Sequence, residues 1–184
     1  MRNGLLVLRW GIVLALIACK REKKDATADM GHATVTTVEV ILVQGSDTVR
    51  GRYKDPDGPG GRPATIDTLR PKANTTYTYT LRVLDESGNP PQDLSSIIFN
   101  DQKNTHRMYF FPDPEALASI EPQDVDDLGR PVGGRGTWRQ GPDTIREGTV
   151  RFLLRHYMSA ADKNFGLERG STDLDVTLPL HIRN

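Results

Sequence analysis

Histidine and methionine occur in pairs along this chain, and these pairs have the clearest potential for metal chemistry. Each methionine after Met1 lies two residues from a histidine, giving Met30/His32, His106/Met108 and His156/Met158. Residues i and i+2 of a β-strand point to the same face, so a pair on a strand presents an imidazole and a thioether together. These donors suit Cu(I), and two pairs on neighbouring strands would supply four ligands. The sequence therefore predicts a site for copper, or for another transition metal, formed by His106, Met108, His156 and Met158.

A structural role for the same side chains is the alternative. Met108 lies in an apolar run, and methionine commonly fills gaps in cores. His156 continues the face of three apolar residues at alternate positions, Val150, Phe152 and Leu154. A hydrogen-bonded core histidine would fit that place equally well.

A second, weaker metal-binding pattern is the turn Asp55-Pro56-Asp57-Gly58. It resembles the start of a calcium loop, but an EF-hand needs a glutamate at its twelfth position, which here is Ile66. A looser calcium site at Asp55 and Asp57 stays open. A plain turn is the competing interpretation, because Asp, Pro and Gly favour turns for local backbone reasons.

Catalytic and nucleic-acid-binding patterns are missing from the sequence. There is no GxSxG, HExxH or Walker motif, and the single cysteine, Cys19, has another expected role. We therefore expect a protein that is not an enzyme, with an unrecognised hydrolase as the alternative. The 24 basic and 24 acidic residues balance, whereas nucleic-acid binding usually needs a basic face.

The first 19 residues have the pattern of an export signal. Arg2 precedes an apolar stretch whose uninterrupted part, residues 10–18, is too short to span a bilayer. Leu16-Ile17-Ala18-Cys19 resembles the lipobox of bacterial lipoproteins. This resemblance implies cleavage after residue 18 and lipid attachment to Cys19. A plain secretory signal, or an uncleaved anchor with a chance cysteine, is the alternative.

The rest of the chain divides into a tether and one domain. Residues 19–33 are polar and lack apolar periodicity, so we expect the lipidated cysteine and a flexible tether there. Residues 34–184 form the expected domain, with strand-like runs separated by turn residues. The runs are 34–43, 48–53, 75–83, 106–111, 136–139, 148–157 and 172–182. They predict an all-β fold, an antiparallel immunoglobulin-like β-sandwich of about seven strands, with a closed β-barrel as the alternative.

Two details of the last strands bear on the site. In residues 172–182 the apolar side chains at even positions are expected inward, and Asp173 and Asp175 outward. The segment 159–170 is long enough to pass from one sheet to the other.

Several short segments together resemble small lipid-anchored β-sandwich lipoproteins of Gram-negative bacteria. They are Thr37-Val38-Glu39, Lys54-Asp55-Pro56-Asp57-Gly58, Lys72-Ala73-Asn74-Thr75-Thr76-Tyr77, residues 106–111, Leu154-Arg155-His156 and Thr172-Asp173-Leu174-Asp175-Val176. The resemblance implies an exported, lipidated sandwich that partners outer-membrane uptake receptors, and it implies no established activity. His106 and His156 resemble positions of that family more closely than the paired methionines do.

The expected function is therefore that of a lipid-anchored envelope protein that binds a small ligand or a metal ion, or assists an outer-membrane uptake system. A structural or protein-interaction module is the alternative. The membrane, through the lipid, and an outer-membrane receptor are the expected partners. Lys20 follows the cysteine without an acidic residue that would suggest inner-membrane retention, so the outer membrane is the expected location.

Overall fold

The computed structural model describes residues 34–183, and this part of the chain is an antiparallel β-sandwich. The predicted all-β sandwich is confirmed, and the sheets of 7 and 3 strands do not close into a barrel. The signal peptide (1–18), Cys19 and the tether (19–33), with Met30 and His32, lie outside the described residues.

The larger sheet is built around β1 and β4, which pair along most of their length. Its strand order is β3-β2-β1-β4-β8-β7, and β5 pairs with β4 off this path. The bounds are β1 (Thr37–Gln44), β2 (Asp47–Lys54), β3 (Thr65–Ile66), β4 (Thr76–Asp85), β5 (Gln92–Asp93), β7 (Ala118–Pro122) and β8 (Arg135–Gln140).

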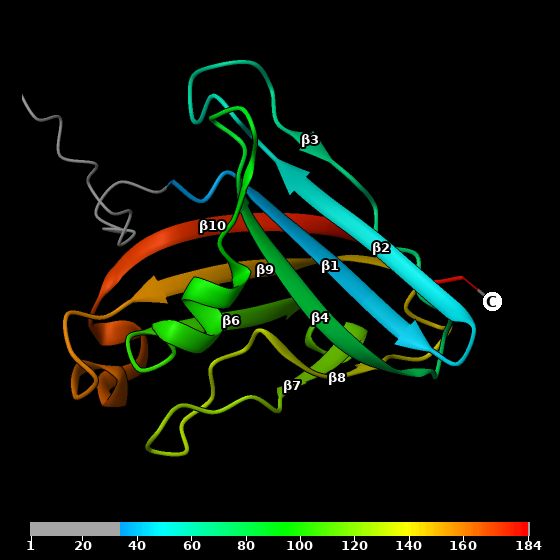
Figure 1. Ribbon diagram of the computed structural model, residues 1–184. Helices are drawn as coiled ribbons and strands as arrows, with labels where there is room; N and C mark the ends of the chain where they lie inside the picture. The colour runs from blue at the N-terminus through cyan, green and yellow to red at the C-terminus, as the bar shows by residue number, and fades with distance from the viewer. Residues whose placement is uncertain (1–33, 184) are drawn as a thin grey trace, which may run out of the picture. The chain divides into compact units, whose positions relative to one another are not determined.

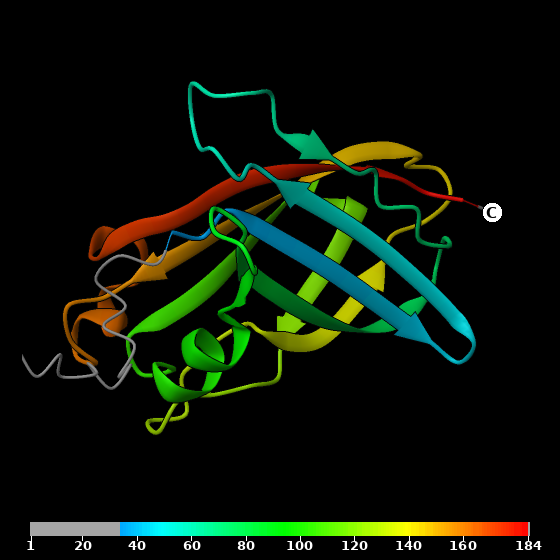
Figure 2. The ribbon, with the colours of Figure 1, turned by 45° about the horizontal axis from the view of Figure 1, so that its top comes forward.

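The smaller sheet has the order β10-β9-β6, with β9 in the centre. Its strands are β6 (His106–Asp113), β9 (Glu147–His156) and β10 (Ser171–His181). They run at an angle to β1, β2 and β4 (Figures 1 and 2). Three short helical segments complete the described elements: η1 (Ile97–Asp101), η2 (Glu115–Leu117) and η3 (Asp162–Glu168).

Alternating apolar residues of both sheets form the core, as the strand pattern predicts. On β4, Tyr77, Tyr79, Leu81 and Val83 are at most 2% exposed. The inward residues of β9 and β10 are also buried, namely Val150, Phe152, Leu154, Leu174, Val176, Leu178 and Leu180. Burying such side chains contributes about 1.5–3 kcal/mol each, so this core dominates the stability of the fold.

The segment between β9 and β10 does not connect the two sheets, and that expectation is wrong. β9 and β10 are neighbours in one sheet, with Ser171 opposite His156. The segment instead forms η3, which carries Lys163 into a buried position where 2% of the residue is exposed. Its length therefore serves to place Lys163 in the interior.

Within residues 34–183, no helix is both long enough and apolar enough to cross a membrane.

Candidate metal centre

The site begins with two histidines that lie opposite each other on paired strands. His106 opens β6, His156 ends β9, and the register places them directly across from one another. Directly opposite residues of an antiparallel pair share a face, so the rings meet. The two imidazoles stack with their centroids 4.5 Å apart and an angle of 5° between the ring planes.

A carboxylate from the third strand of this sheet joins the pair. The register between β9 and β10 shifts between Thr172 and Leu174, which leaves Asp173 as the additional residue of a β-bulge. A bulge re-aims a side chain relative to regular alternation. Asp173 Oδ2 lies 3.4 Å from His106 Nε2. The expectation that Asp173 points away from the inward face is therefore wrong, and the bulge is the reason.

The hydrogen bonds of His106 determine which ring nitrogen is available for a metal. His106 Nδ1 lies 3.1 Å from the carbonyl oxygen of Gln102. A carbonyl only accepts hydrogen bonds, so Nδ1 carries the hydrogen and a neutral His106 has its lone pair on Nε2. That lone pair faces the carboxylate of Asp173, so a proton or a metal ion must lie between them. Metal-binding histidines commonly donate their second N–H to a backbone carbonyl in this way.

The distances fit a metal ion on the Asp173 side of His106. Two donor atoms about 2.1 Å from one ion, at a tetrahedral angle, lie roughly 3.4 Å apart. The separation of His106 Nε2 and Asp173 Oδ2 is 3.4 Å. Each of the residues His106, His156 and Asp173 offers one ligand atom, and these three atoms lie within 4.8 Å of one another. The two rings are nearly parallel, so their nitrogen lone pairs lie in parallel planes, and His156 would have to turn out of the stack to complete a three-ligand site.

Partial burial keeps His156 in the form that binds metals. The His106 side chain is 3% exposed, whereas that of Asp173 is 28% exposed. Partial burial lowers the pKa of His156, the positive charge that His106 carries when protonated lowers it further, and Asp173 opposes both effects. His156 is therefore neutral at pH 7, and neutral imidazole is the metal-binding form.

The two predicted methionine ligands occupy very different places. Met108 is 1% exposed and lies in the core, at the next inward-facing position of β6 after His106. Met158 is 91% exposed and lies beyond β9, which ends at His156. The i, i+2 argument for a shared strand face therefore does not apply to His156 and Met158.

The two aspartates of the predicted calcium loop lie in the turn after β2. Asp57 Oδ2 accepts the backbone N–H of Arg62 at 3.0 Å, and this bond lowers the pKa of Asp57. Asp55 Oδ2 accepts the Tyr53 hydroxyl at 3.4 Å, whereas Asp55 Oδ1 is buried without a hydrogen-bond partner. Among the described residues, His106, His156 and Asp173 are the only group of three or more histidine, cysteine, aspartate or glutamate ligands that come together. The structure therefore adds no third ligand of these types to Asp55 and Asp57.

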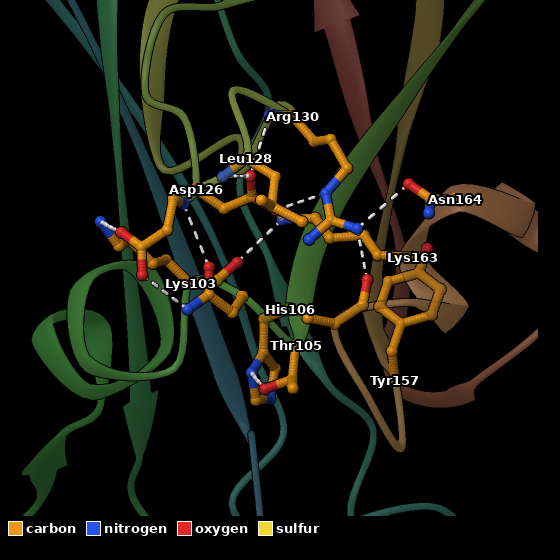
Figure 3. A network of polar contacts seen from close by, with 12 residues as sticks. Lys103, Thr105, His106, Asp126, Leu128, Arg130, Tyr157, Lys163 and Asn164 are labelled. Carbon is orange, nitrogen blue, oxygen red and sulfur yellow. Dashed lines mark hydrogen bonds and ion pairs between the residues drawn. The ribbon is translucent and has the colours of Figure 1, made fainter.

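A buried ionic cluster lies next to this site (Figure 3). Lys163 Nζ is 3.1 Å from Asp126 Oδ2, and both side chains are 0% exposed. Arg130 Nε donates to the same oxygen at 2.8 Å, and the backbone N–H groups of Leu128 and Arg130 donate to Oδ1, each at 2.9 Å. Burial raises the pKa of Asp126, but these N–H donors and Lys163 outweigh it and hold the pKa at about 2.

The ionic cluster also holds the segment that precedes β6. Lys163 Nζ donates to the carbonyl oxygen of Lys103 at 2.8 Å. Asn104 and Asp127 exchange two hydrogen bonds, at 2.8 and 3.1 Å. This segment begins with Gln102, whose carbonyl accepts the Nδ1 hydrogen of His106. The cluster therefore holds the segment whose Gln102 carbonyl fixes the ring orientation of His106.

Sequence reasoning identified both histidines and missed Asp173, Asp126 and Lys163. A single-residue bulge leaves no mark in an alternating pattern. A buried lysine in a polar connecting segment also cannot be distinguished in the sequence from an exposed one, because lysines are rarely buried.

Comparison with protein-family models, with curated proteins and with solved structures gave no match. The chemical interpretation of the site therefore depends on its geometry.

Proposed function

We propose that this chain is a lipid-anchored envelope protein whose sandwich domain binds a divalent transition-metal ion through His106, His156 and Asp173. The observation that carries the proposal is the pairing of His106 Nε2 with Asp173 Oδ2 at 3.4 Å, with the Nδ1 hydrogen held by a carbonyl. The lipid anchor, the outer membrane and an uptake receptor as partner belong to the same proposal and derive from the sequence.

The donor set favours Zn(II) or Cu(II) over Cu(I). Two imidazoles and a carboxylate are common ligands of Zn(II), and imidazole also suits Cu(II). Cu(I) prefers thioether and thiolate sulfur. Since Met158 lies beyond the strand and Met108 is buried in the core, the nitrogen and oxygen donors carry the proposal.

Three protein ligands would leave one coordination position of the ion open. Structural zinc sites are usually closed by four protein ligands, whereas sites with three keep a position for water or another ligand. The exposed His156 and the partly exposed Asp173 leave the ion within reach of solvent. Binding and release of a metal at a membrane surface is therefore the proposed role, and no chemical step is assigned to the site.

Replacing Asp173 with asparagine is expected to weaken Zn(II) binding roughly 10- to 100-fold, because the site loses its only anionic ligand. Asp175→Asn is the matched control on the same strand. Its carboxylate is held by Arg151 Nε and Nη2 at 2.6 and 2.7 Å. Isothermal titration at pH 7.5, on protein purified without a histidine tag, measures both affinities. Equal affinities in the two variants would remove Asp173 from the site.

A further inference from the structure

Large apolar side chains are exposed on two loops of the sandwich, residues 124–131 and residues 158–170, which precede β10. Among the described residues, eight large apolar residues are exposed, and five of them lie in these two loops. Between 47% and 91% of each of the five is exposed, and we call them the apolar loop surface: Val125, Leu128, Met158, Phe165 and Leu167. Single exposed apolar residues are ordinary, whereas a group of them marks an interaction site.

The two loops lie side by side because the buried ionic cluster joins them (Figure 3). Lys163 Nζ in the second loop is 3.1 Å from Asp126 Oδ2 in the first. Arg130 Nη1 donates to Asn164 Oδ1 at 3.1 Å and also to the carbonyl oxygen of Ala160. These bonds hold both loops together, so the ionic cluster supports the apolar loop surface from within.

The charges on the two loops largely compensate each other. Asp127 pairs with Lys103, and Asp162 pairs with Arg169 at 2.8 Å. The Arg169 guanidinium also lies over the ring of Phe165, 4.1 Å from its centroid. Since the charges are paired within the chain, apolar contact is the main interaction that this surface offers to a partner.

The described chain begins at the same end of the sandwich. Thr34, Val35 and Thr36 line one cleft together with residues 173–176 at the start of β10, which follows directly on the second loop. Figures 1 and 2 show this end of the strands opposite the turn between β1 and β2. The apolar loop surface therefore lies at the end where the segment from Cys19 joins the domain.

The length of that segment decides which end of the domain can face a membrane. Fifteen residues separate Thr34 from Cys19, and a chain of that length spans at most about 50 Å. The ten residues of β4 alone cover about 33 Å along the sandwich. Presenting the β1–β2 turn to the membrane would use most of the reach, whereas presenting the apolar loop surface uses little of it.

We propose that the apolar loop surface docks on a phospholipid bilayer and inserts its side chains into the interface. This inference rests on the lipid anchor of the proposed function, which keeps the surface within reach of the bilayer. Such docking is stabilised by the apolar area that enters the interface. Because the charges of the loops are paired, the surface takes zwitterionic lipid and does not need an anionic one. Docking also orients the proposed metal site, since His156 lies two residues before Met158.

The test uses the full lipidated chain, reconstituted into phosphatidylcholine vesicles. Cys19 is the only cysteine and its sulfur carries the lipid, so an introduced cysteine accepts a thiol-reactive fluorophore at one position. Met158→Cys places the label in the apolar loop surface. Ser46→Cys is the matched control, because Ser46 is exposed in the turn between β1 and β2. Phospholipids that carry a nitroxide on the acyl chain quench a label that enters the bilayer.

We expect quenching to be at least about threefold stronger at residue 158 than at residue 46, because interfacial side chains reach roughly 5–10 Å into the bilayer. Leu128→Glu, added to Met158→Cys, should reduce the quenching to the level at residue 46. Val43→Glu changes an exposed apolar residue beside the β1–β2 turn and should leave the quenching at residue 158 unchanged.

The possible failures are distinguishable. If mass spectrometry finds no acyl chains on Cys19, the lipid anchor of the proposed function is overturned and this inference falls with it. If the chain is lipidated but the two labels are quenched equally, or Leu128→Glu leaves the quenching unchanged, the inference alone is overturned. A blue shift of the label at residue 158 without quenching would show that a second copy of the chain covers the surface, and this result would also overturn the inference.

Discussion

Replacing Asp126 with alanine is expected to lower the free energy of unfolding by about 3–5 kcal/mol, the usual cost of removing one partner from a buried ion pair. The variant leaves the Lys163 ammonium buried without its carboxylate, at a side chain that is 0% exposed. It also removes the acceptor of two backbone N–H groups, those of Leu128 and Arg130. Urea unfolding followed by tryptophan fluorescence measures the loss, since Trp138 is 0% exposed in the core.

The neighbouring Asp127 provides the control for this experiment. Its side chain is 62% exposed and pairs with Lys103 at the surface. Asp127→Ala should therefore lower the free energy of unfolding far less than Asp126→Ala does. Adding Lys163→Met to Asp126→Ala should recover part of the loss, because no unpaired ammonium remains. A change below about 1 kcal/mol in Asp126→Ala itself would contradict the account of this cluster.

The same ion pair gives a pH dependence with a defined sign. The pKa of Asp126 is lowered from 3.8 to about 2 in the folded chain, so the unfolded chain takes up the proton first on acidification. The stabilisation is therefore complete above a pH of about 4 and is lost as the pH falls toward 2. The difference in stability between the wild type and Asp126→Ala should shrink over that interval.

Replacing His106 with alanine is expected to weaken Zn(II) binding at least about 100-fold, more than loss of a supporting hydrogen bond usually costs. His106 is the ligand whose Nε2 already lies at a metal-compatible distance from Asp173. Circular dichroism and the melting temperature of the apo protein distinguish loss of the site from loss of the fold. Competition with a chromophoric zinc chelator measures the affinity.

Met108→Leu separates this account from the methionine hypothesis. Met108 lies on the same face of β6 as His106, and leucine conserves most of its volume, so the core should tolerate the change at a cost below about 1.5 kcal/mol. We expect Zn(II) and Cu(II) affinities to be unchanged in this variant. A loss as large as that of His106→Ala would instead identify the thioether as a ligand.

The fold was predictable because its signals are local and repeated. The alternation in β4 and β10 identified the inward residues, and these are buried as predicted. Short strands were harder, because β7 follows directly on the helical turn η2 in a segment between two of the predicted strand runs. The path from β9 to β10 was also missed, since the length of a connection does not tell which strands it joins.

The site was predictable only in part, for a related reason. His106 and His156 were identified from their spacing to methionine, although the cross-strand register is what joins them. Asp173 reaches them because it is the additional residue of a β-bulge. The bulge turns its side chain to the opposite side from the one that the alternating pattern predicts. Lys163 and Asp126 are 37 positions apart in the sequence, and no local pattern indicates that they form an ion pair.

X-ray absorption at the zinc K-edge on the wild-type chain, loaded with one equivalent of Zn(II), tests the central claim most directly. The account predicts a first shell of nitrogen and oxygen at about 2.0–2.1 Å, with the outer-shell scattering of two imidazole rings and no sulfur. The imidazole scattering should be reduced to one ring in His156→Ala. A sulfur neighbour at about 2.3 Å, or a shell of water oxygens without imidazole, would contradict it.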